Sequence, residues 1–171
     1  MVITWRKVAL VLVVAGFALW TYFRFFAAAG KTSTEDLPRA YAAGNPVALV
    51  ELKKRPYDPV LSPAFRSMAT ASPDAKAREA AVWYLAGGTE PAEEGVIISA
   101  LGDPDPKVRQ AACRAARNRR LRQAVDVLIP LLDDDNVDVA GEAQGALQNI
   151  TGIHKYMGRS EWEQRWQLME K

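Results

Sequence analysis

Three segments of this chain repeat one another at a spacing of about 31 residues, and this internal period limits the possible folds more than any other feature. Residues 72–85, 103–116 and 134–147 align without gaps. Their shared apolar columns lie at i, i+4 and i+8, which is one face of a helix. The nine residues expected to form the repeat core are Ala77, Ala81, Leu85, Val108, Ala112, Ala116, Val139, Ala143 and Leu147. Such a period predicts an all-α array of stacked helical pairs.

The starts of the first helices carry capping side chains. Ser72, Asp103 and Asp134 each precede an apolar column. A short polar side chain at that place accepts a hydrogen bond from a free amide of the first turn. Pro73 and Pro104 fit the first helical position. We therefore expect these residues to mark the helix starts.

A second helix is expected after each of the first two. An apolar stripe recurs at i, i+1, i+4 and i+5, which again forms one face of a helix. Its members are Val96, Ile97, Ala100 and Leu101 in the first pair and Val127, Leu128, Leu131 and Leu132 in the second. Thr89 is expected to cap the first of these helices after a turn at Gly87 and Gly88, and the second pair should turn near Asn118.

A degenerate copy precedes these repeats. Asn45-Pro46 and Ser62-Pro63 each read as an N-cap followed by a first-turn proline, and predict helices near 46–55 and 63–71. The whole array would then cover 46–152, with repeats at about 46–71, 72–102, 103–133 and 134–152.

The segment 103–112, which reads DPDPKVRQAA, resembles the HEAT repeat family in its short bacterial form. The aspartate run at 133–135 and the closing stretch 146–152 support the resemblance. It implies an α-solenoid in which an arginine after the valine column binds an aspartate of the neighbouring turn. Arg78 and Arg109 fit that role, whereas Ala140 in the third copy does not, so the ladder should end there. The resemblance indicates architecture and leaves function open.

Residues 1–30 predict a single transmembrane anchor. The run 8–23 is almost wholly apolar, and as a helix the stretch 5–22 would span about 26 Å, close to a hydrocarbon core. The predicted interfacial residues are the aromatic side chains at both ends and an arginine that can reach headgroups: Trp5, Trp20, Tyr22, Phe23 and Arg24. Residues 31–45 are expected to form a linker with a short helix.

A cleavable signal peptide is the alternative for this segment, with Arg6-Lys7 as its basic region and 27–29 as an A-x-A site. We favour the anchor. Arg6 and Lys7 make the N-terminal flank the more basic one. This predicts a cytoplasmic N-terminus and a periplasmic soluble domain at a bacterial cytoplasmic membrane.

Residues 153–171 predict a C-terminal tryptophan-containing helix. Ser160 and Glu163 have the spacing of a capping box. Trp162, Trp166 and Met169 follow at i, i+4 and i+7, one helical face. This face could close the open end of the solenoid, which repeats require. Alternatively Trp162 and Trp166 could dock into a partner, because tryptophan is a common interface anchor.

Few residues are suited to chemistry. The single cysteine and single histidine exclude disulfides, His-cluster metal sites and a conventional triad within the chain. Asp103, Asp105 and the run 133–135 stand at helix starts, where acidic side chains cap amides. Cys113 is expected to be buried and inert, and His154 to lie in a loop. We expect no catalytic, cofactor-binding or metal-binding residues.

One basic cluster surrounds the turn of the central repeat. The formal net charge of the chain is only +2, so this cluster is a local feature. It consists of Arg114, Arg117, Arg119, Arg120 and Arg122. It is either a solvated turn or a contact for something acidic, such as a partner's carboxylates or anionic lipid headgroups. Nucleic acid is not expected, because no aromatic residues interleave with the arginines.

These features favour a non-enzymatic scaffold or accessory subunit of a bacterial membrane complex, for example a respiratory or photosynthetic one. Its partners would be other subunits of that complex, with lipid contacting the N-terminal helix. A membrane-anchored adaptor or assembly chaperone is the first alternative. The second is an enzyme, since some HEAT-like proteins resemble lyases that attach bilin chromophores. The absence of an acid–base constellation in the sequence weighs against it.

Overall fold

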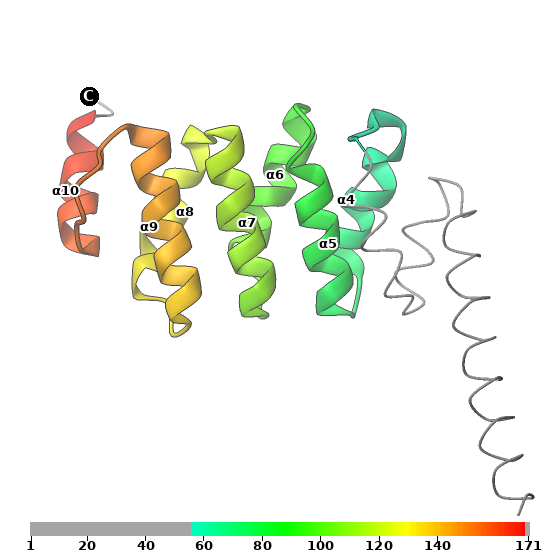
Figure 1. The fold of residues 1–171 in the computed structure, drawn as a ribbon, viewed down its shortest axis with the longest axis horizontal. Coiled ribbons are helices and arrows are strands. Elements are labelled where there is room, and N and C mark those ends of the chain that lie inside the picture. The colour runs from blue at the N-terminus through cyan, green and yellow to red at the C-terminus, as the bar shows by residue number, and fades with distance from the viewer. Residues whose placement is uncertain (1–55, 170–171) are drawn as a thin grey trace, which may run out of the picture. The chain divides into compact units, whose positions relative to one another are not determined.

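The computed structural model describes residues 56–169, and every regular element in that range is helical. The elements in chain order (Figure 1) are η1 (Pro59–Leu61), α4 (Ser62–Ala71), α5 (Ala75–Leu85), α6 (Pro91–Ala100), α7 (Pro106–Arg119), η2 (Arg122–Ala124), α8 (Val125–Leu128), η3 (Pro130–Asp133), α9 (Val137–Thr151) and α10 (Arg159–Met169). Within this range, the structure confirms the all-α solenoid.

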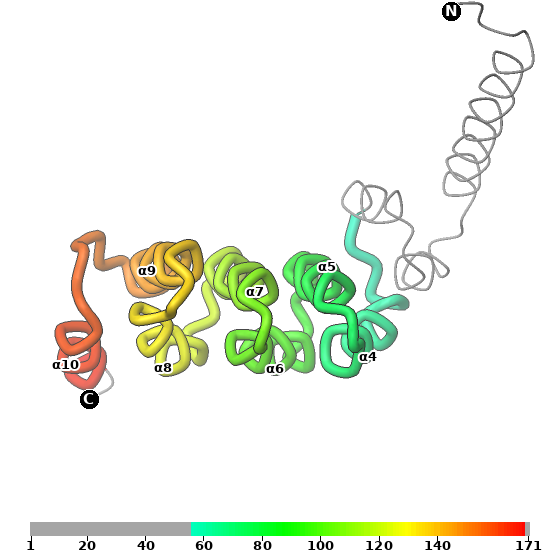
Figure 2. Tube along the Cα trace, turned by 90° about the horizontal axis from the view of Figure 1, so that it is seen from below, coloured from blue at the N-terminus to red at the C-terminus, as the bar shows by residue number. Residues whose placement is uncertain are grey.

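The helices of this array form two rows. Figure 2 shows α5, α7 and α9 side by side in one row, with α4, α6, α8 and α10 in the other. α10 follows α8 in the second row, although a long connection separates it from α9. It thus takes the place that a second helix of the last repeat would occupy.

The core lies between and along these rows. All nine residues of the predicted repeat core are fully buried. Five of the nine are alanines, which let α5, α7 and α9 approach closely without leaving voids. Larger side chains of the second row, such as Phe65, Ile97 and Leu128, fill the space behind them.

The first helices begin later than the sequence predicts. Asp74, Asp105 and Asn136 are the N-caps of α5, α7 and α9, each two residues beyond the predicted cap. Their side chains accept hydrogen bonds from amides of the first turn, for example Asp105 Oδ1 from Lys107 N at 2.8 Å. The first helical proline is Pro106 in α7, and Pro73 and Pro104 lie before the caps.

The predicted caps have another role. Ser72, Asp103 and Asp134 accept a hydrogen bond from the amide of the true cap residue two positions on, at 3.3, 2.9 and 2.9 Å. They therefore shape the turn that leads into each helix. The prediction was wrong because aspartate and serine satisfy amides equally well in a turn and at a cap.

The second helices also differ from expectation. Glu90 is the N-cap of α6, rather than Thr89. The second helix of the central repeat, α8, covers only four residues and has 3₁₀ turns on both sides, because Pro130 has no amide to continue the α-helical bonding. Val127 is 37% exposed, and the buried face consists of Ala124, Val125, Leu128 and Ile129. The predicted stripe was thus partly wrong in this helix.

The degenerate first copy is described only in part. α4 corresponds to the helix expected near 63–71. Ser62 is its first residue rather than its N-cap, because η1 leads directly into it. The helix expected at 46–55, the linker at 31–45 and the anchor with Trp5, Trp20, Tyr22, Phe23 and Arg24 lie outside the described residues. From 56 to 169, no helix has the length and apolar character needed to cross a membrane.

Candidate functional site

A ladder of ion pairs joins consecutive repeats. Arg78 binds Asp103 through two hydrogen bonds, Nε to Oδ2 at 2.7 Å and Nη2 to Oδ1 at 2.8 Å. Arg109 binds Asp134 in the same way, with both distances 2.8 Å. The contacts implied by the family resemblance are therefore present. Ala140 has no guanidinium to form the next rung.

These rungs are partly buried and electrostatically coupled. The Arg109 guanidinium, helped by the amide of Asn136, holds the pKa of the Asp134 carboxyl below its usual value despite some burial. Burial alone would raise the pKa of Asp103, but its bonds to Arg78 and to the amide of Asp105 outweigh burial and lower it. Both carboxylates are thus stabilised in the charged form. The ladder holds the repeats together, and its charges are already paired.

The basic cluster at the central turn separates into paired and unpaired arginines. Glu142 of α9 binds Arg114 at 2.7 Å and Arg117 at 3.1 Å. Both arginines therefore link α7 to α9 through the same carboxylate. The sequence predicts them as partner contacts, but the structure gives each of them a carboxylate within the chain.

Arg119 is the most buried member of the cluster, with 7% of its side chain exposed. Its guanidinium donates to Glu93 Oε2 at 3.2 Å and to Glu94 Oε1 at 3.1 Å. It also donates to the carbonyls of Leu85 and Glu90. Arg119 thus connects α7 to the start of α6, although the sequence analysis places it among the candidate partner contacts.

Glu93 is the centre of a buried polar network that the sequence analysis did not find. Its side chain is fully buried and accepts hydrogen bonds from Ser62 Oγ at 2.7 Å, from Arg119, from the amide of Glu90 and from the Tyr57 hydroxyl. The network joins α4, α6 and α7. A possible sequence signal was a glutamate at the third position of a predicted helix, close behind two glycines.

Gly88 makes room for this network. A Cβ atom added at Gly88 would collide with the carboxylate of Glu93. The glycine is therefore required by close approach, and the Gly87–Gly88 pair does more than turn the chain. Its neighbour Gly87 would place a Cβ 3.1 Å from that of Tyr57.

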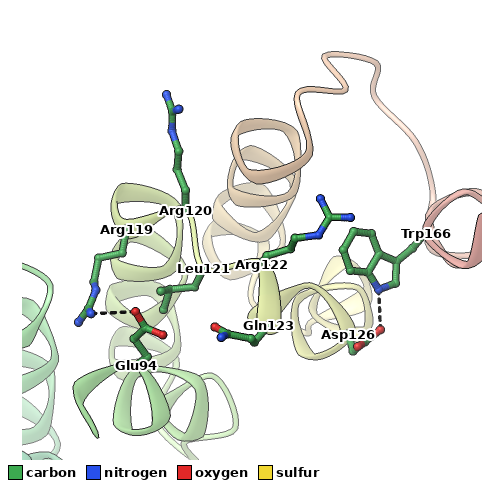
Figure 3. Close-up of a pocket in the computed structure, with 8 residues that line it drawn as sticks. All are labelled: Glu94, Arg119, Arg120, Leu121, Arg122, Gln123, Asp126 and Trp166. Carbon is green, nitrogen blue, oxygen red and sulfur yellow. Dashed lines mark hydrogen bonds and ion pairs between the residues drawn. The ribbon is translucent and has the colours of Figure 1, made fainter. Parts of the chain in front are cut away.

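An open groove lies beside the two remaining arginines. It has a volume of about 490 Å³. Its walls come from the α7–α8 connection, α6 and α10, and Figure 3 labels the residues that line it: Glu94, Arg119, Arg120, Leu121, Arg122, Gln123, Asp126 and Trp166. Arg119 points towards Glu94, whereas Arg120 extends away from the other labelled side chains.

The two tryptophans of α10 are buried against the array. Trp162 is fully buried and donates from Nε1 to Gln144 Oε1 at 3.3 Å. Trp166 is 4% exposed and donates to Asp126 Oδ1 at 2.8 Å, with the Arg122 guanidinium 4.8 Å from its ring centroid. This is the packing expected of a terminal cap. As partner anchors both would first have to leave these contacts.

The start of α10 differs from the predicted capping box. The helix begins at Arg159, so Ser160 lies inside its first turn. Glu163 accepts a hydrogen bond from Arg159 Nε at 2.9 Å instead of reaching back to the cap. Met169, the third member of the predicted stripe, is 38% exposed.

The described residues contain no group of three or more histidine, cysteine, aspartate or glutamate side chains that could hold a metal ion. Cys113 is fully buried, and burial raises the pKa of its thiol to about 12. His154 is exposed in the connection before α10. Asp133 pairs with Arg159 at 3.6 Å.

Comparison with known proteins gives one family. Residues 62–148, just over half of the chain, match the model for HEAT repeats. No curated protein and no solved structure matches the chain. The match begins with α4 and ends within α9.

Proposed function

The chain belongs to the HEAT repeat family, and on that premise we propose that it is a non-enzymatic scaffold, an accessory subunit of a bacterial membrane complex. HEAT repeats form helical scaffolds for protein interaction, since stacked pairs present long continuous surfaces. In this proposal residues 1–30 tether the array to the cytoplasmic membrane, and the repeats hold neighbouring subunits on the periplasmic side.

One observation carries the proposal. The conspicuous charged side chains of the repeats form contacts between repeats, such as Arg109 with Asp134 and Arg117 with Glu142. These contacts fix the relative positions of α5, α7 and α9. A fixed stack gives a preformed surface, which lowers the entropic cost of binding a partner.

Purification of the tagged chain from native membranes tests this proposal. A structural subunit should co-purify with the same proteins in a fixed ratio, and that ratio should survive exchange into a second detergent. A ratio that falls with each wash would favour the adaptor or chaperone. Migration as a free monomer on a native gel of solubilised membranes would contradict the proposal.

The location is tested separately. Tyr156 is 81% exposed and is replaced by cysteine. In intact spheroplasts, a cysteine-reactive reagent that cannot cross the membrane should label this cysteine. Cys113 is replaced by alanine in this variant, so that one thiol remains. Labelling only after the spheroplasts are lysed would place the repeats in the cytoplasm, against the proposal.

A further inference from the structure

The unpaired charge of the basic cluster is confined to two residues. Arg114, Arg117 and Arg119 each bind a carboxylate of the chain. In residues 56–169 the side chain of Arg120 makes no hydrogen bond or ion pair, and that of Arg122 makes neither but lies over the ring of Trp166. Both line the same groove.

The first observation concerns the backbone at Arg120, where an arginine stands at a position that glycine fits more easily. Arg120 has φ 53° and ψ 46°, and it is the only non-glycine residue with positive φ in the part of the chain that the structure describes. It ends α7 in the left-handed conformation that glycine adopts most easily. Gly152 occupies the equivalent place after α9. The strain at Arg120 is not offset by any contact of its side chain within the array.

The second observation is the arrangement at Arg122. Its guanidinium lies over the indole ring of Trp166, which is itself fixed by the bond to Asp126. In the described residues the Arg122 guanidinium makes no hydrogen bond or ion pair, so its N–H groups can donate in the fork that matches a carboxylate. Trp166 therefore orients a donor group beside the groove (Figure 3).

We propose that this groove binds an acidic segment of a partner protein, with Arg120 and Arg122 each holding a carboxylate of that segment. The inference rests on the proposed scaffold function and names the chemistry of the partner. A membrane surface fits less well, because Glu94 and Asp126 also line the groove and would face a sheet of anionic headgroups. A peptide can place its carboxylates at the two arginines and avoid both acidic side chains.

Fluorescence anisotropy with labelled hexaglutamate tests this inference on the full chain in detergent micelles. We expect saturable binding that weakens with salt. Arg120→Gly and Arg122→Gln should each weaken it by about tenfold, since each removes a charge-assisted contact. Arg120→Gly should also raise the Tm, because it relieves the left-handed backbone, so lost binding cannot reflect lost folding.

Arg114→Gln is the matched control. It removes the same charge from an exposed arginine near the end of α7, and Glu142 keeps Arg117 as its partner. Equal weakening by this control, or no saturable binding of hexaglutamate, would overturn the inference. So would binding to nanodiscs containing phosphatidylserine that depends on Arg120 and Arg122 when hexaglutamate binding does not.

The test separates this inference from the scaffold proposal. If subunits co-purify in a fixed ratio with the Arg120→Gly/Arg122→Gln chain as with wild type, and hexaglutamate binding is unaffected, the scaffold stands and the groove is not its site. If hexaglutamate binds through both arginines but nothing co-purifies, the groove stands and the scaffold proposal fails.

Discussion

Arg109 and Asp134 form a two-point ion pair that links the central repeat to the next, with both N–O distances 2.8 Å. The same guanidinium donates to the carbonyl of Asp103 at 2.9 Å, and Asp103 lies in the turn that leads into α7. Arg109 therefore holds the chain on both sides of the junction. Side-chain exposure is 17% for Arg109 and 6% for Asp134, so water competes little for these bonds.

Replacing Arg109 should weaken the stack. We expect Arg109→Ala to lower the free energy of unfolding by about 2 kcal/mol, because it leaves a partly buried carboxylate and carbonyl without a donor. Arg109→Lys should recover only part of this loss, since an ammonium cannot make the two parallel bonds. Urea denaturation of the chain in detergent micelles measures both. Arg114→Ala, which breaks a pair that is half exposed, is the control and should cost about 0.5 kcal/mol or less.

The ladder also makes stability depend on pH. Because the pKa values of Asp103 and Asp134 are lower in the folded chain, their contribution is complete above the unfolded aspartate pKa of about 3.9. It is lost as the pH falls from there towards the lower folded value. The difference in unfolding free energy between wild type and Asp134→Asn should therefore be largest near neutral pH and shrink below about pH 4. A difference that stays constant down to about pH 3 would show that the Asp134 charge is not coupled to folding.

The glycines offer a matched pair of substitutions. Gly88→Ala should destabilise the chain by about 2 kcal/mol, because the new methyl group would meet a Glu93 carboxylate that four donors hold in place. Gly95 lies in α6, and a Cβ atom added there would have no neighbour within 4 Å. Gly95→Ala should therefore stabilise the chain by about 0.5–1 kcal/mol through helix propensity. Thermal unfolding followed by circular dichroism gives both signs. An unchanged Tm for Gly88→Ala would mean that the Glu93 network is loosely held.

The sequence predicted the stacked repeats, but it predicted neither the buried Glu93 network nor the residues that cap the helices. Periodicity identified the nine core residues in their three columns, because burial of one helix face repeats along the chain. The family resemblance, and not the period, identified Arg78 and Arg109. It could not find Glu93, since its partners Tyr57, Ser62 and Arg119 lie in three different segments and follow no period. It also misplaced the caps, because Asp103 and Asp105 have the same local chemistry and only the three-dimensional turn decides which one caps α7.

The basic cluster shows the same limit. Five arginines near one turn look alike in the sequence, yet the fold gives three of them carboxylate partners. Which arginines stay free depends on where Glu93, Glu94 and Glu142 lie, and these residues belong to other helices. Likewise, the sequence of the last helix fits either a cap or a partner anchor. Only the fold shows that its tryptophans pack against α9 and α8.

Cys113 provides a direct test of how tightly α7 packs. It is the only cysteine of the chain, so any thiol label reports on this position alone. Burial raises the pKa of its thiol to about 12. At about pH 8 only about one thiol in ten thousand would be ionised, and the thiolate is the reactive form. We expect iodoacetamide to leave the folded chain unmodified for hours and to label it within minutes in concentrated urea, as mass spectrometry would show.

Arg109→Ala should speed the labelling in buffer by opening the contact between α7 and α9, whereas Arg114→Ala should leave it slow. Rapid labelling of the folded wild-type chain would show that α7 separates from its neighbours without global unfolding, and that the ladder does not hold the stack closed.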